Sequence, residues 1–200
     1  MRKLLFMALI TTAGMLAAQS QVLDMDAALR NGDVSLTASG NGSSSGASVE
    51  GYLQNNRTVI IRISIVISGG IYLKNSGSAQ NMVATQVYLA DGGYYIENDM
   101  AFIELAPRSR TEIMLIAFCA DFELDNPSPN DSFSRGSMPS ALQAITAKVS
   151  RFMADHPDED IVTAAQLAVW LARGETLESI SEKFDFTSDD VVLARRIMAY

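Results

Sequence analysis

A lone cysteine and a glutamine in an apolar stretch are the residues of this sequence best suited to covalent chemistry. Cys119 closes a β-type run, and Gln166 lies further along the chain in an otherwise apolar segment, residues 161–172. A cysteine thiolate that attacks a glutamine carboxamide releases ammonia and leaves an acyl group on sulfur, which a surface amine can capture. The alternative is structural: Gln166 hydrogen-bonds a strand-edge or loop carbonyl, and Cys119 is a small buried side chain.

Three short motifs carry a resemblance to a known family. Cys119 comes first, a proline-containing loop at residues 126–129 follows, and a Gln-x-Ala-x-Trp motif comes last, made of Gln166, Ala168 and Trp170. This order resembles the thioester (TQXA-type) domains of bacterial surface adhesins. It is equally similar to a group of exported bacterial domains of unassigned function. The resemblance implies an internal thioester between the Cys119 thiol and the Gln166 side chain.

Two neighbours of Gln166 bear on this motif. Trp170 lies four residues on and therefore on the same helix face, where its ring could cover Gln166. Alternatively, Trp170 fills the interface between sheet and helices. Ala165 stands where the adhesin motif usually has threonine, so this chain lacks a hydroxyl that could orient the amide.

Other reaction centres have less support in the sequence. His156 is the only histidine and could serve a Cys–His hydrolase with Cys119, but it lies in an acidic loop at residues 155–160, where a solvated turn residue is the ordinary explanation. One histidine and one thiol are too few for a transition-metal site. Asp121, Glu123 and Asp125 alternate along the chain as a solvated strand edge would. We therefore predict no metal site, no cofactor and no enzymatic activity.

Three tyrosines mark a candidate binding surface. Tyr88, Tyr94 and Tyr95 flank the turn at residues 91–93. Tyrosines at a loop tip make good contacts with sugars, peptides or other proteins. The same spacing is also typical of cross-strand pairs within a sheet.

The first 20 residues have the pattern of a secretory signal peptide. Arg2 and Lys3 precede an apolar run at residues 4–18, and small residues follow it. We expect cleavage near Ser20 and a secreted, periplasmic or cell-surface product without a transmembrane segment in the mature chain. The single cysteine excludes an intramolecular disulfide.

The charge balance narrows the choice of partner. The chain has 15 basic and 23 acidic residues and a net charge of −8 at pH 7, and loss of Arg2 and Lys3 makes it more acidic. Such a surface repels nucleic acid, although residues 177–198 have the pattern of helix, turn and helix. The expected partner is a protein or glycan at the cell exterior.

The hydrophobic periodicity predicts an α+β chain. Residues 58–67 alternate as a central strand, and further short β-type runs with Gly, Asn and Pro turns follow to residue 122. From residue 138 the spacing becomes helical. We predict a signal peptide (1–20), a flexible Gly/Ser-rich leader (21–48), an antiparallel β-sandwich of about six or seven strands (49–130) and a helical lobe of about four helices packed on it (131–200). The predicted function is a non-catalytic, extracytoplasmic binding or adhesion-type module, with covalent adhesion through a Cys119–Gln166 thioester as the alternative.

Overall fold

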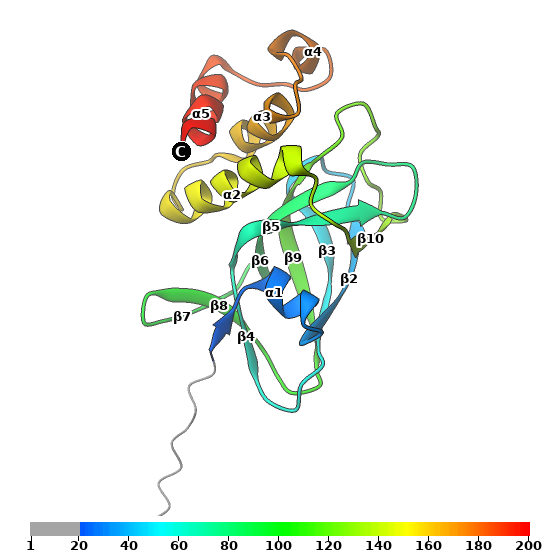
Figure 1. The fold of residues 1–200 in the computed structure, drawn as a ribbon, viewed down its shortest axis with the longest axis vertical. Coiled ribbons are helices and arrows are strands. Elements are labelled where there is room, and N and C mark those ends of the chain that lie inside the picture. The colour runs from blue at the N-terminus through cyan, green and yellow to red at the C-terminus, as the bar shows by residue number, and fades with distance from the viewer. Residues whose placement is uncertain (1–20) are drawn as a thin grey trace, which may run out of the picture.

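A closed barrel of six strands forms the centre of the molecule (Figure 1). The computed structural model describes residues 21–200, and the predicted signal peptide lies outside them. The strands follow the order β10-β2-β3-β9-β6-β5 around the barrel, so the predicted two-sheet sandwich is wrong. Their bounds are β2 Val34–Gly40, β3 Ser45–Asn55, β5 Val66–Asn75, β6 Met82–Leu89, β9 Arg110–Cys119 and β10 Ser132–Arg135.

The shortest barrel strand closes the ring. β10 pairs antiparallel with β2 on one side and β5 on the other, and Phe133 lies opposite Ala38 and Asn75. Register shifts in β3, β5 and β6 bend the longer strands, as closure of a sheet requires. Four residues after a proline-containing loop carry too little periodicity to reveal this pairing, which is why the sequence suggested two open sheets.

A smaller mixed sheet lies beside the barrel. Its order is β1 (Val22–Leu23), β4 (Ile61–Ser64), β8 (Met100–Leu105) and β7 (Tyr95–Glu97), and β1 runs parallel to β4. The single strand predicted at residues 58–67 is therefore split, because the chain leaves the small sheet after Ser64 and joins the barrel at Val66. The Ser64 hydroxyl accepts a hydrogen bond from the Val66 N–H at this transition.

The segment predicted as a flexible leader, residues 21–48, is regular structure. It contains β1, the helix α1 (Met25–Arg30), β2 and the start of β3. Asp24 caps α1 by accepting from the Ala27 N–H at 3.1 Å, and Met25 is fully buried. The Gly- and Ser-rich composition of residues 40–48 suggested disorder, but here it serves a tight turn and a bulged strand start.

Four helices follow the barrel and lie at one end of it (Figure 1). They are α2 (Ser140–Asp155), α3 (Val162–Ala172), α4 (Leu177–Ser181) and α5 (Ser188–Ala199). They do not form a separate lobe, since α2 packs along β5 and β6, and α3 packs on β3 and β9 as well as on α2 and α5. Within residues 21–200, none of the helices has the length and apolar character needed to span a membrane.

A substitution at Gly51 can test the close approach of β2 and β3. A Cβ at this position would lie 2.0 Å from the carbonyl oxygen of Thr37, whereas one at the exposed Gly69 of β5 would meet nothing within 4 Å. We expect Gly51→Ala to lower the free energy of unfolding by about 1–3 kcal/mol. Gly69→Ala should change it by less than about 0.5 kcal/mol. Urea denaturation followed by circular dichroism measures both, and equal effects would contradict the described strand packing.

Candidate functional site

The two residues that the motif singles out are in direct contact. Gln166 Oε1 accepts a hydrogen bond from the Cys119 N–H at 2.8 Å, and Gln166 Nε2 donates to the Cys119 carbonyl at 2.9 Å. Both residues are fully buried. The carboxamide of α3 therefore pairs with the backbone at the end of β9 much as another strand would.

The strand register around Cys119 shows where the Gln166 side chain joins the barrel. Cys119 is the last residue of β9, and the paired register with β3 ends one residue earlier, where Phe118 lies opposite Ser45. The Cys119 N–H also donates to the Ser44 carbonyl at 3.0 Å. Gly46 has a φ of +76° and lies against α3, because a Cβ there would be 3.3 Å from a methyl of Val162. The start of α3 thus sits close to β3, which brings Gln166 to the strand end.

The thiol of Cys119 is held in a protected environment. Its Sγ lies 3.5 Å from Met82 Sδ and 3.8 Å from Asn126 Oδ1. Burial, and to a smaller extent the charge of Asp121, raises the pKa of Cys119 to about 12. The thiol is therefore protonated at neutral pH, and an uncatalysed attack from it is slow.

No Cys–His pair forms among the described residues. His156 lies at the end of α2, where its ring stacks on Phe152 at 4.0 Å and its Nδ1 lies 3.0 Å from the Phe152 carbonyl. Cys119 instead contacts Met82, Asn126 and Gln166. The Cys–His hydrolase considered from the sequence therefore has no geometry to support it.

Two of the three carboxylates after β9 have separate partners. Asp121 accepts from Asn81 and pairs with Arg173, and Glu123 pairs with Lys183 at 2.7 Å. Over residues 21–200, no three His, Cys, Asp or Glu side chains are grouped so that they could hold a metal ion.

Trp170 belongs to an aromatic cluster beside the Cys119–Gln166 contact. Its ring meets Phe122 and Phe184 edge to face, with centroids 5.1 Å away in each case. Ala168, the other motif residue, is fully buried in α3. Contact of Trp170 with Phe122 and Phe184 was not predicted from the sequence, because the three residues come from the segment after β9, from α3 and from the segment after α4.

The three predicted tyrosines lie near one another around the small sheet. Tyr88 of β6 meets Tyr94 edge to face at 5.8 Å, and Tyr95 of β7 stacks on Phe102 at 6.0 Å. Tyr94 and Tyr95 are about half exposed, whereas burial and the neighbouring Tyr94 raise the pKa of Tyr88. Sequence reasoning missed Ile96 and Met100 on the same hairpin, which are 69% and 49% exposed.

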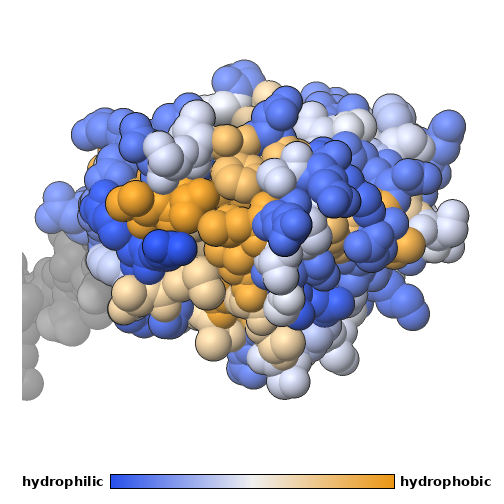
Figure 2. Space-filling view, turned by 90° about the horizontal axis from the view of Figure 1, so that it is seen from above, coloured by the Kyte–Doolittle hydropathy of each residue, from blue (hydrophilic) through white to orange (hydrophobic). Residues whose placement is uncertain are grey.

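A cleft of about 600 Å³ opens beside this β7–β8 hairpin. Tyr94, Ile96 and Met100 line one side, and Met153 and Pro157 at the end of α2 line another. Apolar side chains also gather on the helical end of the molecule (Figure 2), where Val192 of α5 is 59% exposed.

The site brings the Gln166 carboxamide to the backbone of Cys119, and the β7–β8 hairpin presents an apolar surface. Comparison with protein-family models, with curated proteins and with solved structures found no match to the chain. The resemblance to thioester domains therefore depends on Cys119 and on the Gln166, Ala168 and Trp170 motif.

Gln166 can be tested as the link between α3 and the barrel. We expect Gln166→Leu, which keeps the size but removes both hydrogen bonds to Cys119, to lower the free energy of unfolding by about 1–3 kcal/mol. Gln143→Leu, on the exposed face of α2, is the matched control and should have little effect. Urea denaturation followed by tryptophan fluorescence gives both values. If the two variants unfold alike, the Gln166 contact does not anchor α3.

Proposed function

We propose that this chain is an exported, adhesion-type module in which Cys119 and Gln166 form an internal thioester. The observation that carries the proposal is the contact of the Gln166 carboxamide with Cys119, made between two fully buried residues. The module is non-catalytic, because each thioester is consumed when one surface amine captures it.

The described geometry supplies part of the chemistry. The Cys119 sulfur adds to Gln166 Cδ, a C–S bond forms, the C–N bond breaks, and ammonia leaves with the thiol proton. Negative charge develops on Gln166 Oε1 during the addition, and the Cys119 N–H that donates to this oxygen at 2.8 Å stabilises it. Because the raised pKa of the thiol leaves little thiolate at neutral pH, the addition is slow. We therefore expect the bond to form gradually, during or after folding.

Burial supports the second requirement, which is protection from water. Cys119 and Gln166 have no exposed surface, and the Asp121–Arg173 pair and the Phe122–Trp170 contact lie next to them. Capture by an amine then requires local separation of α3 from β9. The amine forms an amide with the acyl group of Gln166, and Cys119 regains its thiol.

Export is part of the same proposal. Its support is the signal pattern of residues 1–20, with Arg2 and Lys3 before the apolar run. The partner at the cell exterior is a protein or glycan that carries or lies near a reactive amine, and the acidic chain favours partners with basic groups.

The β7–β8 hairpin favours a second candidate, non-covalent binding. Tyr94, Tyr95, Ile96 and Met100 are all more than 40% exposed on one short hairpin beside the 600 Å³ cleft. Exposed apolar groups gathered in one place are typical of interaction surfaces. In this case the module holds its partner by apolar contact and the Cys119–Gln166 pair is only a structural link.

Intact mass spectrometry tests the thioester. The chain is made from Val22 onward in amine-free buffer, because an N-terminal Gln21 could itself cyclise and lose ammonia. We expect a mass lower than calculated by one ammonia, and no deficit in Cys119→Ala or Gln166→Leu. Added methylamine should open the thioester, which adds the mass of one methylamine to the lighter form and frees one thiol.

The opposite result is equally clear. If the parent chain has its calculated mass and Cys119 is alkylated only after unfolding, the thioester is absent and the non-covalent candidate remains. Gln143→Leu is the control that should behave as the parent chain in either case.

The hairpin surface is tested with Nile red, a neutral dye that fluoresces in apolar sites. We expect the folded chain to enhance its fluorescence, and the double variant Ile96→Ser, Met100→Ser to lose most of this enhancement because the cleft loses its apolar side. Val192→Ser, on the helical end, should retain it. Equal enhancement in parent and double variant would exclude the cleft as an apolar binding site.

A further inference from the structure

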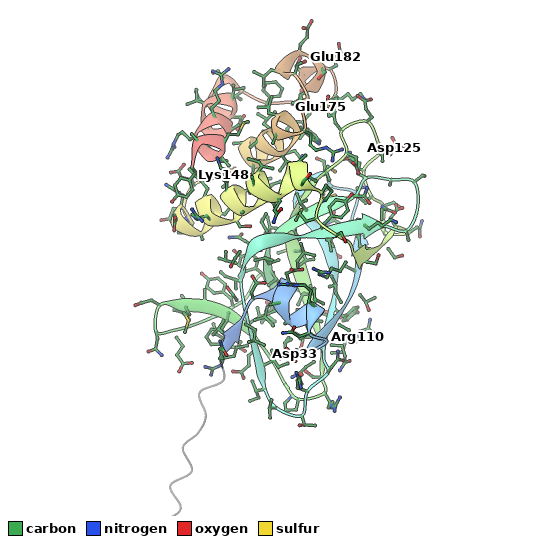
Figure 3. The ribbon with its side chains drawn as sticks, in the orientation of Figure 1. Asp33, Arg110, Asp125, Lys148, Glu175 and Glu182 are labelled. Atoms are coloured by element: carbon green, nitrogen blue, oxygen red, sulfur yellow. The ribbon has the colours of Figure 1, made fainter. Side chains whose placement is uncertain are left out.

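The β7–β8 hairpin carries the inner face of the small sheet beyond the body of the molecule (Figure 1 and Figure 3). Ile63 of β4 and Ile103 of β8 lie opposite each other on this face, and both are fully buried. Ala101 lies two residues nearer the hairpin turn on the same face, and Ile96 lies opposite it with 69% of its surface exposed. The row of apolar side chains therefore begins in the core and ends in solvent, beside the cleft of about 600 Å³.

The same hairpin has a free backbone edge. β7 lies at one end of the small sheet and, within residues 21–200, pairs only with β8. Asn98 and Asp99 both have positive φ and form a two-residue turn, so Glu97 and Met100 close the hairpin as a hydrogen-bonded pair. Hydrogen-bonded and non-hydrogen-bonded pairs alternate along an antiparallel ladder, so the N–H and carbonyl of Ile96 point away from β8. An extended peptide is the kind of partner that pairs with such groups.

The lining of the cleft is negatively charged. Asp24 and Asp99 line it, and among residues 21–200 no lysine or arginine does so. Both carboxylate oxygens of Asp24 accept backbone N–H groups, from Ala27 and Ser68, so this charge is held in place. Asp99 is exposed in the hairpin turn. A ligand in the cleft therefore meets two carboxylates and no cation.

The α2 side of the cleft adds further negative charge. Pro157, which lines the cleft, belongs to an exposed loop that contains Asp155, Asp158, Glu159 and Asp160. Two of these charges are offset, because Arg151 precedes Asp155 by one turn of α2 and Glu159 pairs with Arg196 at 3.4 Å. Asp158 and Asp160 leave the loop acidic.

The basic residue of the small sheet does not neutralise the cleft. Arg62 lies on the opposite face from Ile96, where its guanidinium is 4.7 Å from the centre of the Phe102 ring. It pairs there with Glu97 and Glu104. The charge around the cleft therefore favours a partner with basic groups.

We propose that the cleft binds a short extended peptide that carries both apolar and basic side chains. The inference rests on the non-covalent candidate proposed above and names its partner. The peptide backbone pairs with Ile96 at the free edge of β7, apolar side chains cover Ile96 and Met100, and basic side chains lie near Asp24 and Asp99. The edge selects a peptide, the exposed apolar row selects apolar residues, and the carboxylates select lysine or arginine.

Displacement of Nile red by two matched peptides tests the partner. The Cys119→Ala chain is used, because lysine amines would react with a thioester. The probe is a capped heptapeptide of three apolar residues flanked by two lysines on each side, and its counterpart has glutamate in place of lysine. We expect the lysine peptide to displace the dye, and the glutamate peptide to do so at least about tenfold more weakly, because four charges change sign. A lysine peptide with an N-methylated backbone should also bind about tenfold more weakly, because it cannot add to the β7 edge.

Two variants of the Cys119→Ala chain locate the charge effect. Asp99→Asn keeps the turn, because asparagine tolerates the φ of +61° at this position. It should weaken the lysine peptide about two- to fivefold, as loss of one exposed charge implies, and leave Nile red binding unchanged. Glu182→Gln removes the same charge at the far side of the helices, away from the hairpin (Figure 3), and should bind both ligands as its parent does. Thermal unfolding confirms that each variant is folded.

Other outcomes overturn the inference. If Nile red binds but the lysine peptide does not displace it at millimolar concentration, the cleft is apolar but is not a site for such a peptide. If the glutamate or the N-methylated peptide displaces the dye equally well, charge or the β7 edge does not select the partner. If Nile red itself does not bind, the non-covalent candidate fails too, so the two failures are distinguishable.

Discussion

The pair of hydrogen bonds between Gln166 and the backbone of Cys119 is the constraint on which the junction of barrel and helices depends. α3 is buried along its length, and a polar side chain in such a helix must find partners inside the protein. At the end of β9 the register with β3 ends, and Gln166 pairs there with the Cys119 carbonyl and shares the Cys119 N–H with the Ser44 carbonyl. α3 in turn packs on α2 and α5.

Burial at this junction has two opposite consequences for chemistry. It raises the pKa of the Cys119 thiol and so makes the nucleophile scarce, yet it also excludes water from any acyl group held there. The Cys119 N–H acts on the carbonyl and not on the thiol. It polarises the Gln166 carbonyl, and no charged base is needed for this effect. In the proposed thioester chemistry, these features favour a slow, single reaction whose product is protected.

The sequence was informative where chemistry or periodicity is local. The resemblance implied contact between Cys119 and Gln166, and the structural alternative expected Gln166 to hydrogen-bond a strand-edge or loop carbonyl, which the Cys119 carbonyl at the end of β9 is. The helical spacing of residues 138–172 located α2 and α3. Barrel closure by β10 was not foreseeable, since pairing with β2 and β5 depends on distant strands rather than on its own four residues. The break after Ser64 was hidden because alternation continues through it although the chain changes sheets.

The Gly- and Ser-rich composition of residues 21–48 also led to a wrong prediction. Residues 21–48 were expected to be flexible because glycine and serine lower the apolar content, but Gly46 and its neighbours allow strands and α3 to approach closely. Of the cleft beside the β7–β8 hairpin, only Tyr94 was predicted. The rest of its lining comes from residues such as Val22, Met100 and Met153, which have no common spacing in the sequence.

The short closing strand β10 has a mechanical consequence. The helices are joined to the barrel in sequence only through β10, which a pulling force on the C-terminal end would reach first and could peel from β2 and β5. The Gln166–Cys119 link runs to β9 by a separate route and shares that force. If the Gln166–Cys119 link consists of hydrogen bonds alone, it breaks once α3 is pulled away from β9. A covalent bond at the same place would keep the helices attached to the barrel after β10 has separated from β2 and β5.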